Sequence, residues 1–144
     1  MNDTKNYVLK KRIAEEMMDD YSGALERHFE LAKQFLRVTR EGKVSVLFKE
    51  KLTGEEQIVL YLIGKLYAKE GGFVEKDEVD NKELMDELGI PKGSLLPWLK
   101  NLRDKKTVKQ MKRGRNVFHT VPINLVEKTL KNIEKKLNRH PKGD

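Results

Sequence analysis

The sequence contains no cysteine, and this absence excludes several kinds of site. A chain without thiols forms no disulfide, holds no metal through thiolates and has no cysteine nucleophile. Proteins that lack disulfides are typical of reducing compartments. We therefore expect an intracellular, cytoplasmic protein.

Long apolar runs and catalytic motifs are also missing. The longest apolar run covers the six residues Ile58–Ile63, whereas a membrane-spanning helix needs about 20. Residues 1–6 have no apolar stretch typical of a secretory signal. His28, His119 and His140 are far apart in the sequence, and no phosphate-binding glycine loop or nucleophile motif is found. These absences predict a protein that is not an enzyme and has no cofactor, no metal site and no membrane partner.

Basic residues, in contrast, are abundant and concentrated in one block. The net charge of the chain is +7, and residues 91–119 contain nine Lys or Arg against one acidic residue. Residues 1–90 are acidic on balance, with 15 basic and 19 acidic side chains. A local excess of this size is typical of a surface that binds a polyanion. The alternative is a solvated lysine-rich surface without a partner.

The N-terminal part of the sequence predicts a helical arm with one short strand. Leu25, Phe29, Ala32 and Leu36 follow the spacing of one helix face, which predicts a helix over residues 22–36. Residues 44–48 alternate between apolar and polar side chains, as a short strand does. We assign this arm to residues 1–52.

The following helix has a clear start and end. Thr53 and Glu56 form the pattern of a capping box, and Gly71–Gly72 follows the last helical residue, Glu70. The helix is apolar most of the way round, so we expect it to be packed on two sides.

The order of the remaining elements predicts a winged helix-turn-helix domain at residues 53–121. Asp80 begins a short helix with Glu83 as its capping-box partner, and Gly89 ends that helix. A second helix follows that buries Leu95, Leu99 and Leu102. Two strands at 108–112 and 116–121 then flank a basic turn at Gly114. The predicted fold class is mainly α with a small β-hairpin, extended by helices at both ends, the last within residues 122–144.

The helix-turn-helix segment resembles a known family. The run Gly93-Ser94-Leu95-Leu96-Pro97-Trp98-Leu99-Lys100-Asn101-Leu102 is similar to the recognition helix of PadR-like transcriptional regulators, which usually have Tyr where this chain has Leu96. The hairpin at 109–118 is similar to the basic wing of that family. The resemblance covers about residues 53–121 and implies a DNA-binding regulator.

The chemistry of this segment suggests which side chains contact DNA. Donors and acceptors near the start of the recognition helix are suited to reading the major groove, and wing arginines to the minor groove or to phosphates. If Ser94 caps the helix, Pro97 falls in its first turn, where a proline is tolerated. Trp98 either stacks on DNA or packs within the protein. The expected DNA-binding residues are Lys92, Ser94, Trp98, Lys100, Asn101, Arg103, Lys105, Lys106, Lys109, Lys112, Arg113 and Arg115.

The last helix predicts a homodimer. Its narrow apolar stripe is flanked by lysines and resembles a coiled-coil seam formed by Val126, Leu130, Ile133 and Leu137. In the alternative, the stripe packs on its own chain. We therefore expect a sequence-specific double-stranded DNA-binding regulator that acts as a dimer. The rival hypothesis is a winged-helix module that binds protein or RNA in a larger nucleic-acid-associated complex. The sequence leaves open the DNA target, the sign of regulation and any small-molecule effector.

Overall fold

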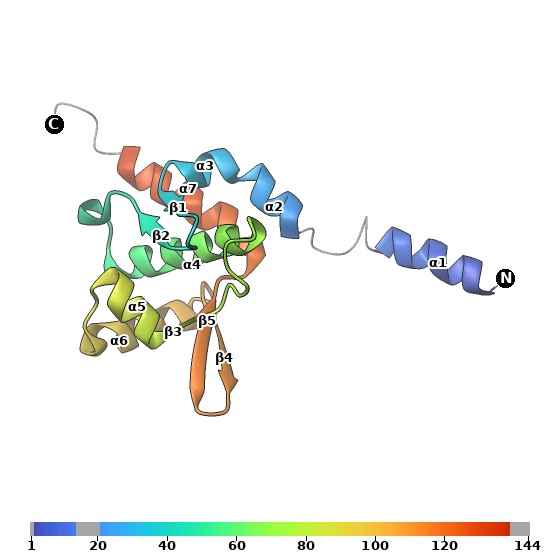
Figure 1. Cartoon of the computed structure of the whole chain (residues 1–144). Helices are drawn as coiled ribbons and strands as arrows, with labels where there is room; N and C mark the ends of the chain where they lie inside the picture. Colours follow the sequence, from blue (N-terminus) through green and yellow to red (C-terminus); the bar gives the residue numbers. More distant parts are fainter. Residues whose placement is uncertain (1, 14–20, 139–144) are drawn as a thin grey trace.

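The computed structural model describes residues 2–13 and 21–138 and shows a mainly helical chain with two small antiparallel sheets (Figure 1). The helices are α1 (Asn2–Arg12), α2 (Tyr21–Arg27), α3 (Phe29–Lys33), α4 (Gly54–Glu70), α5 (Asn81–Leu88), α6 (Lys92–Asp104) and α7 (Val126–Asn138). Two short 3-10 helices are η2 (Lys49–Lys51) and η3 (Ile123–Leu125). The strands are β1 (Leu36–Val38), β2 (Val44–Val46), β3 (Val79–Asp80), β4 (Lys109–Arg113) and β5 (Asn116–Thr120).

Helix α4 begins at the capping box that the sequence predicts. The Glu56 amide donates to the Thr53 hydroxyl at 3.1 Å, and the Thr53 amide donates to the Glu56 carboxylate at 2.8 Å. The helix ends at Glu70 and is followed by Gly71 and Gly72, with Gly72 at a positive φ of 79°. Both predicted boundaries of this helix are confirmed.

Helix α4 is buried on nearly all sides, as its apolar sequence predicts. Strands β1 and β2 pack on it from the N-terminal part, and α5, α6 and α7 pack on it from the C-terminal part. Gly64 permits β2 to approach α4 closely, because a Cβ at this position would lie 2.3 Å from the Val44 side chain. The segments predicted as an arm, a central domain and a terminal helix therefore share one core through α4.

The helix predicted over residues 22–36 is present as two helices, α2 and α3, and the prediction is wrong for residues 34–36. The chain turns at His28 between α2 and α3, and Leu36 is the first residue of β1. Strand β1 pairs with β2, with Leu36 opposite Val46. This pairing overrides the helical spacing, because it joins segments that a local pattern does not connect.

The strand predicted over 44–48 is confirmed only for Val44–Val46. Phe48 lies outside it in a left-handed conformation with φ 59°, and 47% of its side chain is exposed. A residue in a β-strand needs an extended backbone. Phe48 has a left-handed backbone instead, so the strand ends before it.

Helix α5 has half of the predicted capping box. The Asp80 carboxylate accepts from the Glu83 amide at 2.8 Å, but the Glu83 side chain contacts Tyr61 and Lys65 of α4 instead of returning to the helix start. Gly89 ends the helix at a positive φ of 67°, a conformation that glycine adopts without strain.

Helix α6 begins earlier than the sequence predicts. Pro91 is its N-cap, and the Pro91 carbonyl accepts from the amides of Ser94 and Leu95. Ser94 is therefore inside the first turn instead of capping it, and Pro97 lies in the second turn. Proline lacks the amide that would reach the Gly93 carbonyl, and both Gly93 and Pro97 are on the exposed side of the helix.

Strands β4 and β5 form the predicted hairpin, with β4 at 109–113 instead of 108–112 and β5 at 116–120 instead of 116–121. Arg113 pairs with Asn116, so Gly114 and Arg115 form a two-residue turn. Gly114 has a positive φ of 62° at the first central position, as tight hairpin turns require. Strand β3 adds to the other edge of β5, and the sheet order is β3-β5-β4.

Helix α7 packs its apolar stripe on its own chain. Val126, Leu130 and Ile133 are at most 3% exposed, Leu137 packs against the same core, and the contacts are to α3 and α4. Lys136 also pairs with Glu56 at the start of α4, at 2.6 Å. The structure thus has the intramolecular packing that the sequence left as the alternative to a dimer seam. The homodimer stays a prediction.

Candidate nucleic-acid interface

Helix α6 presents one polar, basic face to solvent. Leu95, Leu99 and Leu102 are buried at 5% or less, which fixes the orientation of the helix. The exposed positions are Lys92, Gly93, Leu96, Pro97, Lys100, Asn101 and Asp104. Lys92, Leu96 and Lys100 are spaced by four residues and therefore lie along one line of this face.

The N-terminus of α6 is suited to an anion. Its first turn contains no acidic residue, and Lys92 is its first residue. A helix N-terminus has unsatisfied amides and a partial positive charge. The space around Gly93 is open to an approaching anion, since even a Cβ at this position would have no atom within 4 Å. This end of the helix therefore has the open space and the partial positive charge that an anion such as phosphate requires.

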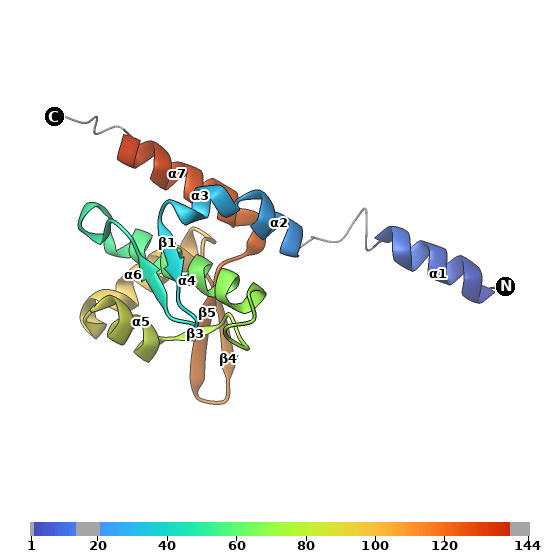
Figure 2. The same cartoon turned by 45° about the horizontal axis from the view of Figure 1, so that its top comes forward.

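The β4–β5 hairpin is the second basic element. Lys109, Lys112, Arg113 and Arg115 are exposed on it. In both views the hairpin projects from the half of the protein that contains α5 and α6, whereas α7 and α3 lie in the opposite half (Figures 1 and 2). The two basic elements therefore share one side of the molecule.

Arg113 is held by a buried carboxylate. Its guanidinium lies 2.8 Å from Glu78, whose side chain is only 9% exposed, and 5.8 Å from the centroid of the Phe118 ring. This arrangement fixes Arg113 at the base of the turn. Arg115, in the turn itself, has no such partner among residues 2–13 and 21–138.

Acidic side chains neutralise part of the α6 face. Lys100 pairs with Asp104 at 3.4 Å, and Lys105 pairs with Glu55 of α4 at 3.6 Å. The Asn101 amide also donates to Glu55 at 3.4 Å. All three contacts are at the surface, where ion pairs are weak and exchange readily for phosphates.

Trp98 is placed within the protein. Its ring packs against the first turn of α4, where a Cβ at Gly54 would lie 2.2 Å from the ring. Trp98 is partly buried and belongs to the apolar core. The structure thus has the packing within the protein that the sequence left as the alternative for Trp98, and a contact of Trp98 with DNA stays a prediction.

The other predicted contact residues divide into two groups. Ser94 and Arg103 are half-buried, Ser94 in the first turn of α6 and Arg103 near the sheet. The exposed residues are Lys92, Lys100, Asn101, Lys105, Lys106, Lys109, Lys112, Arg113 and Arg115. The sequence analysis missed Leu96 as a surface residue, although 44% of it is exposed. The four-residue spacing of Leu96 from Lys92 and from Lys100 was the available signal.

A buried histidine connects the sheet to α5. His119 of β5 is 1% exposed, and its Nε2 lies 2.6 Å from the Asn81 side-chain oxygen. Burial, together with the smaller effect of the positive charge of Arg103, lowers the pKa of His119 to about 4, and the negative charge of Asp80 opposes the shift. The imidazole is therefore neutral at pH 7 and has a structural role.

A buried polar cluster joins α4 to α5. The Glu83 carboxylate accepts from the Tyr61 hydroxyl at 2.5 Å and lies 3.2 Å from the Lys65 ammonium. Burial raises the pKa of Tyr61, and the Glu83 charge raises it further. The cluster fixes the position of α5 against α4. Helix α5 packs beside α6 and so helps to orient the exposed face of α6.

Residues 2–13 and 21–138 contain no group of three or more His, Cys, Asp or Glu side chains arranged to bind a metal ion. Within the same ranges, every helix is too short or too polar to cross a bilayer.

Comparison with known proteins gives no relative. No protein-family model, curated protein or solved structure matches this chain. Its function is therefore inferred from its own geometry and charge.

Proposed function

We propose that this protein is a sequence-specific double-stranded DNA-binding transcriptional regulator with a winged helix-turn-helix. In this proposal α5 and α6 are the helix-turn-helix, with Gly89 in the turn, and the β4–β5 hairpin is the wing. The order of elements from α4 to β5 and the sheet order β3-β5-β4 support this assignment.

One observation carries the proposal more than any other. The block of residues 91–119, with nine basic residues and one acidic residue, coincides with α6 and the hairpin, and both elements lie on the same side of the protein. A solvated lysine-rich surface has no reason to follow two elements of the size and shape that fit the grooves of DNA. The resemblance of α6 to the recognition helix of PadR-like regulators adds independent support.

The proposed division of labour follows from the geometry. Helix α6 enters the major groove with Lys92, Leu96 and Asn101 near base edges. Lys100 and Lys105 contact phosphates after exchanging their carboxylate partners, and Arg115 at the wing tip contacts the minor groove or the backbone.

The decisive experiment is a fluorescence-anisotropy titration of mixed-sequence duplex DNA at several salt concentrations. We expect log K to fall linearly with log salt, by about 0.9 per phosphate neutralised. Selection of a preferred duplex would then define the target sequence.

A matched pair of variants tests the wing. Lys112→Ala with Arg115→Ala removes two charges from the hairpin, whereas Lys128→Ala with Lys135→Ala removes two exposed charges from α7 on the opposite side. We expect weaker binding for the wing variant, with the salt slope reduced by about 2, and no change for the α7 variant. Equal effects would mean that only net charge matters.

The rival hypothesis is tested by the same titration. If duplex DNA stays unbound at low salt, the protein is better described as a module that binds RNA or protein. Single-stranded RNA would then replace the duplex in the titration.

A further inference from the structure

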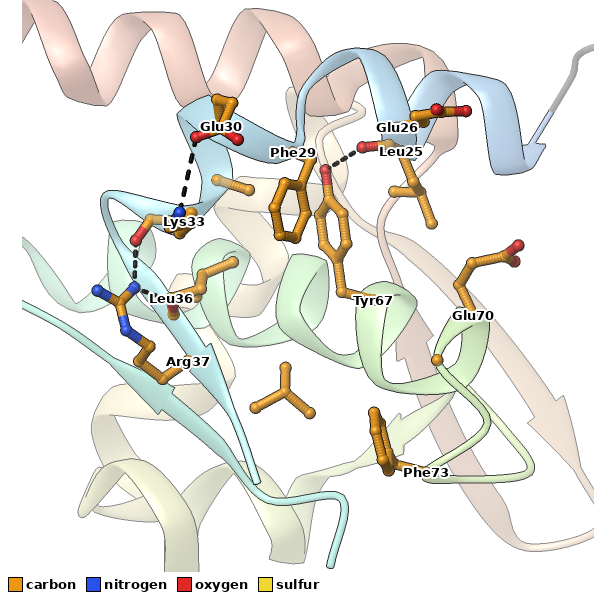
Figure 3. Close-up of a pocket in the computed structure, with 13 residues that line it drawn as sticks. Leu25, Glu26, Phe29, Glu30, Lys33, Leu36, Arg37, Tyr67, Glu70 and Phe73 are labelled. Carbon is orange, nitrogen blue, oxygen red and sulfur yellow. Dashed lines mark hydrogen bonds and ion pairs between the residues drawn. The ribbon is translucent and has the colours of Figure 1, made fainter. Parts of the chain in front are cut away.

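A groove with aromatic walls lies between α3 and the end of α4 (Figure 3). It has a volume of about 930 Å³ and is formed by α2, α3, β1, α4 and the residues that follow α4. The Phe29 and Tyr67 rings lie side by side on one wall, with centroids 6.3 Å apart, and Phe73 lies on the other. Four aliphatic side chains also line the groove: Leu25, Ala32, Leu36 and Val38.

The protein itself holds these aromatic walls in place. The Tyr67 hydroxyl donates to the Leu25 carbonyl at 2.7 Å. The Phe73 ring packs over Gly71, where a Cβ would lie 2.7 Å from a ring atom. Phe29 is nevertheless 48% exposed and Phe73 is 46% exposed. Large aromatic side chains that remain half-exposed in one preformed concave site are typical of a ligand-binding site.

The charged side chains of the lining balance one another. Lys33 lies 3.8 Å from Glu30, and Arg37 donates to the main-chain carbonyls of Lys33 and Leu36. Two more glutamates lie on the opposite side of the groove from these cations: Glu26 and Glu70. An anion in the groove would face the glutamates, and a cation would face the basic side chains. The groove is therefore electrostatically complementary to an uncharged molecule.

The size of the groove is that of a small-molecule site. Thirteen residues line it, whereas a stable protein interface takes about 20–30 residues from each partner. Its volume lies within the range of roughly 300–1,000 Å³ that is typical of ligand pockets. An extended peptide would also bury main-chain amides and carbonyls, which need hydrogen-bond partners. The Tyr67 hydroxyl already donates its proton to Leu25 and does not supply it to such a carbonyl.

We propose that this groove binds an uncharged, planar aromatic molecule. The molecule lies between the wall formed by Phe29 and Tyr67 and the wall formed by Phe73, and it packs its rings against theirs at the offset or tilted angles that aromatic pairs prefer. It removes the exposed faces of Phe29 and Phe73 from water. No residue of α6 or of the hairpin lines this groove. The site therefore goes beyond the proposed DNA binding, and its tests require no DNA.

A matched pair of fluorescent probes tests the class of ligand. N-phenylnaphthylamine is uncharged, and anilinonaphthalene sulfonate has the same rings with one negative charge. The fluorescence of both increases when they pass from water to an apolar site. We expect the full chain to bind the uncharged probe at one saturable site, and more tightly than the sulfonate. No saturable binding of the uncharged probe, or tighter binding of the sulfonate, overturns the proposal.

Substitution of the exposed rings locates the bound probe. Phe29→Ala and Phe73→Ala should each weaken binding of the uncharged probe by roughly twofold to tenfold, the effect of losing one aromatic contact. Phe48→Ala is the matched control, because Phe48 is 47% exposed but lies outside the groove. It should bind the probe as the wild type does. Unchanged binding in both groove variants, or an equal loss in the control, contradicts the proposal.

Gly71→Ala provides a second test that removes no aromatic ring. Gly71 has a φ of −76°, which alanine adopts without strain, but the added Cβ displaces the Phe73 ring. We expect binding to weaken by about the same factor as in Phe73→Ala. Gly93→Ala is the control, because its Cβ has no atom within 4 Å and lies outside the groove. Wild-type affinity in Gly71→Ala would contradict a site between fixed aromatic walls.

The same titration distinguishes a groove that the protein covers by itself. We expect one probe affinity at protein concentrations up to tens of micromolar, and the same affinity after Leu9→Asp with Ile13→Asp in the exposed N-terminal helix. An affinity that falls as protein concentration rises would show that a second copy occupies the groove. An affinity that rises in the Leu9 and Ile13 variant would show that the N-terminal helix occupies it. Either result overturns the proposal.

Discussion

At the scale of single residues, His119 couples the stability of the fold to pH. Its Nε2 is bonded to Asn81, and its buried Nδ1 has no hydrogen-bond partner within the described chain. Protonation would place a new N–H at Nδ1 with nothing to accept it, and it would also create a buried charge. The folded protein therefore resists protonation, as the pKa of about 4 indicates.

This resistance to protonation makes the folded protein less stable as the pH falls. An unfolded histidine titrates near pH 6.5, so below that pH the unfolded chain binds more protons than the folded chain. We expect the free energy of unfolding to fall by roughly 2 kcal/mol between pH 7 and pH 5. Urea denaturation across this range measures it. His119→Gln should flatten the dependence, whereas an unchanged slope in that variant would assign it to other groups.

A second prediction at the residue scale concerns Leu96. If α6 enters the major groove as proposed, an exposed leucine between Lys92 and Lys100 is suited to contact the methyl group of thymine. On a selected DNA site, replacing the contacted thymine by uracil should cost the wild type roughly 0.8 kcal/mol, the value of one buried methyl. Leu96→Ala should bind both duplexes equally well. A wild-type protein that does not distinguish any thymine from uracil would contradict this role.

At the scale of elements, the contact between α4 and α6 determines how the exposed face of α6 is presented. Trp98 of α6 lies against α4 at Gly54. The contacts of Glu83 with Tyr61 and Lys65 fix α5 against α4. These contacts join α4, α5 and α6 at closely packed positions. A larger side chain there would leave the neighbouring residues little room to move. The orientation of α6 is therefore a property of the packing and not of α6 alone.

Two glycines provide a matched test of this packing. Gly54→Ala places a Cβ 2.2 Å from the Trp98 ring, whereas Gly93→Ala meets no atom within 4 Å. We expect Gly54→Ala to destabilise the protein by about 1–3 kcal/mol, as overpacking does. Gly93→Ala should be neutral or stabilising by up to about 1 kcal/mol, because alanine favours the helix. Chemical denaturation of both variants decides, and equal stabilities would show that Trp98 moves aside readily.

At the scale of the whole molecule, α4 unites segments that the sequence divides into an arm, a domain and a terminal helix. The Tyr67–Leu25 hydrogen bond joins α4 to α2, and the Lys136–Glu56 ion pair joins it to α7. Removing either flank would expose completely buried side chains of α4, among them Leu60 and Leu62. The part from α2 to α7 should therefore unfold as one unit.

Truncation tests this cooperativity. A fragment of residues 53–121 should lack a cooperative unfolding transition, because β1, β2 and α7 no longer cover α4. A chain that starts at residue 21 should keep the transition, since side chains 6–13 are exposed. Thermal unfolding followed by circular dichroism distinguishes them. A cooperatively folded 53–121 fragment would restore the three-part division.

The sequence alone determined the features that depend on local chemistry. The Thr53 capping box, the Gly89 helix end, the buried face of α6 and the glycine turn of the hairpin are each encoded within a few residues, because capping and turn geometry are short-range. The basic block at 91–119 was equally visible, since charge is counted directly. DNA binding and dimerisation remain predictions that these features motivate.

Only the tertiary structure decided the features that depend on distant partners. Leu36 joined a strand because Val46 pairs with it, Trp98 packed inward because Gly54 leaves room for its ring, and the α7 stripe was covered by its own chain. The groove between α3 and the end of α4 was equally invisible to the sequence analysis. In each case the outcome depends on which surfaces meet in space, and periodicity along one segment contains no information about its partner.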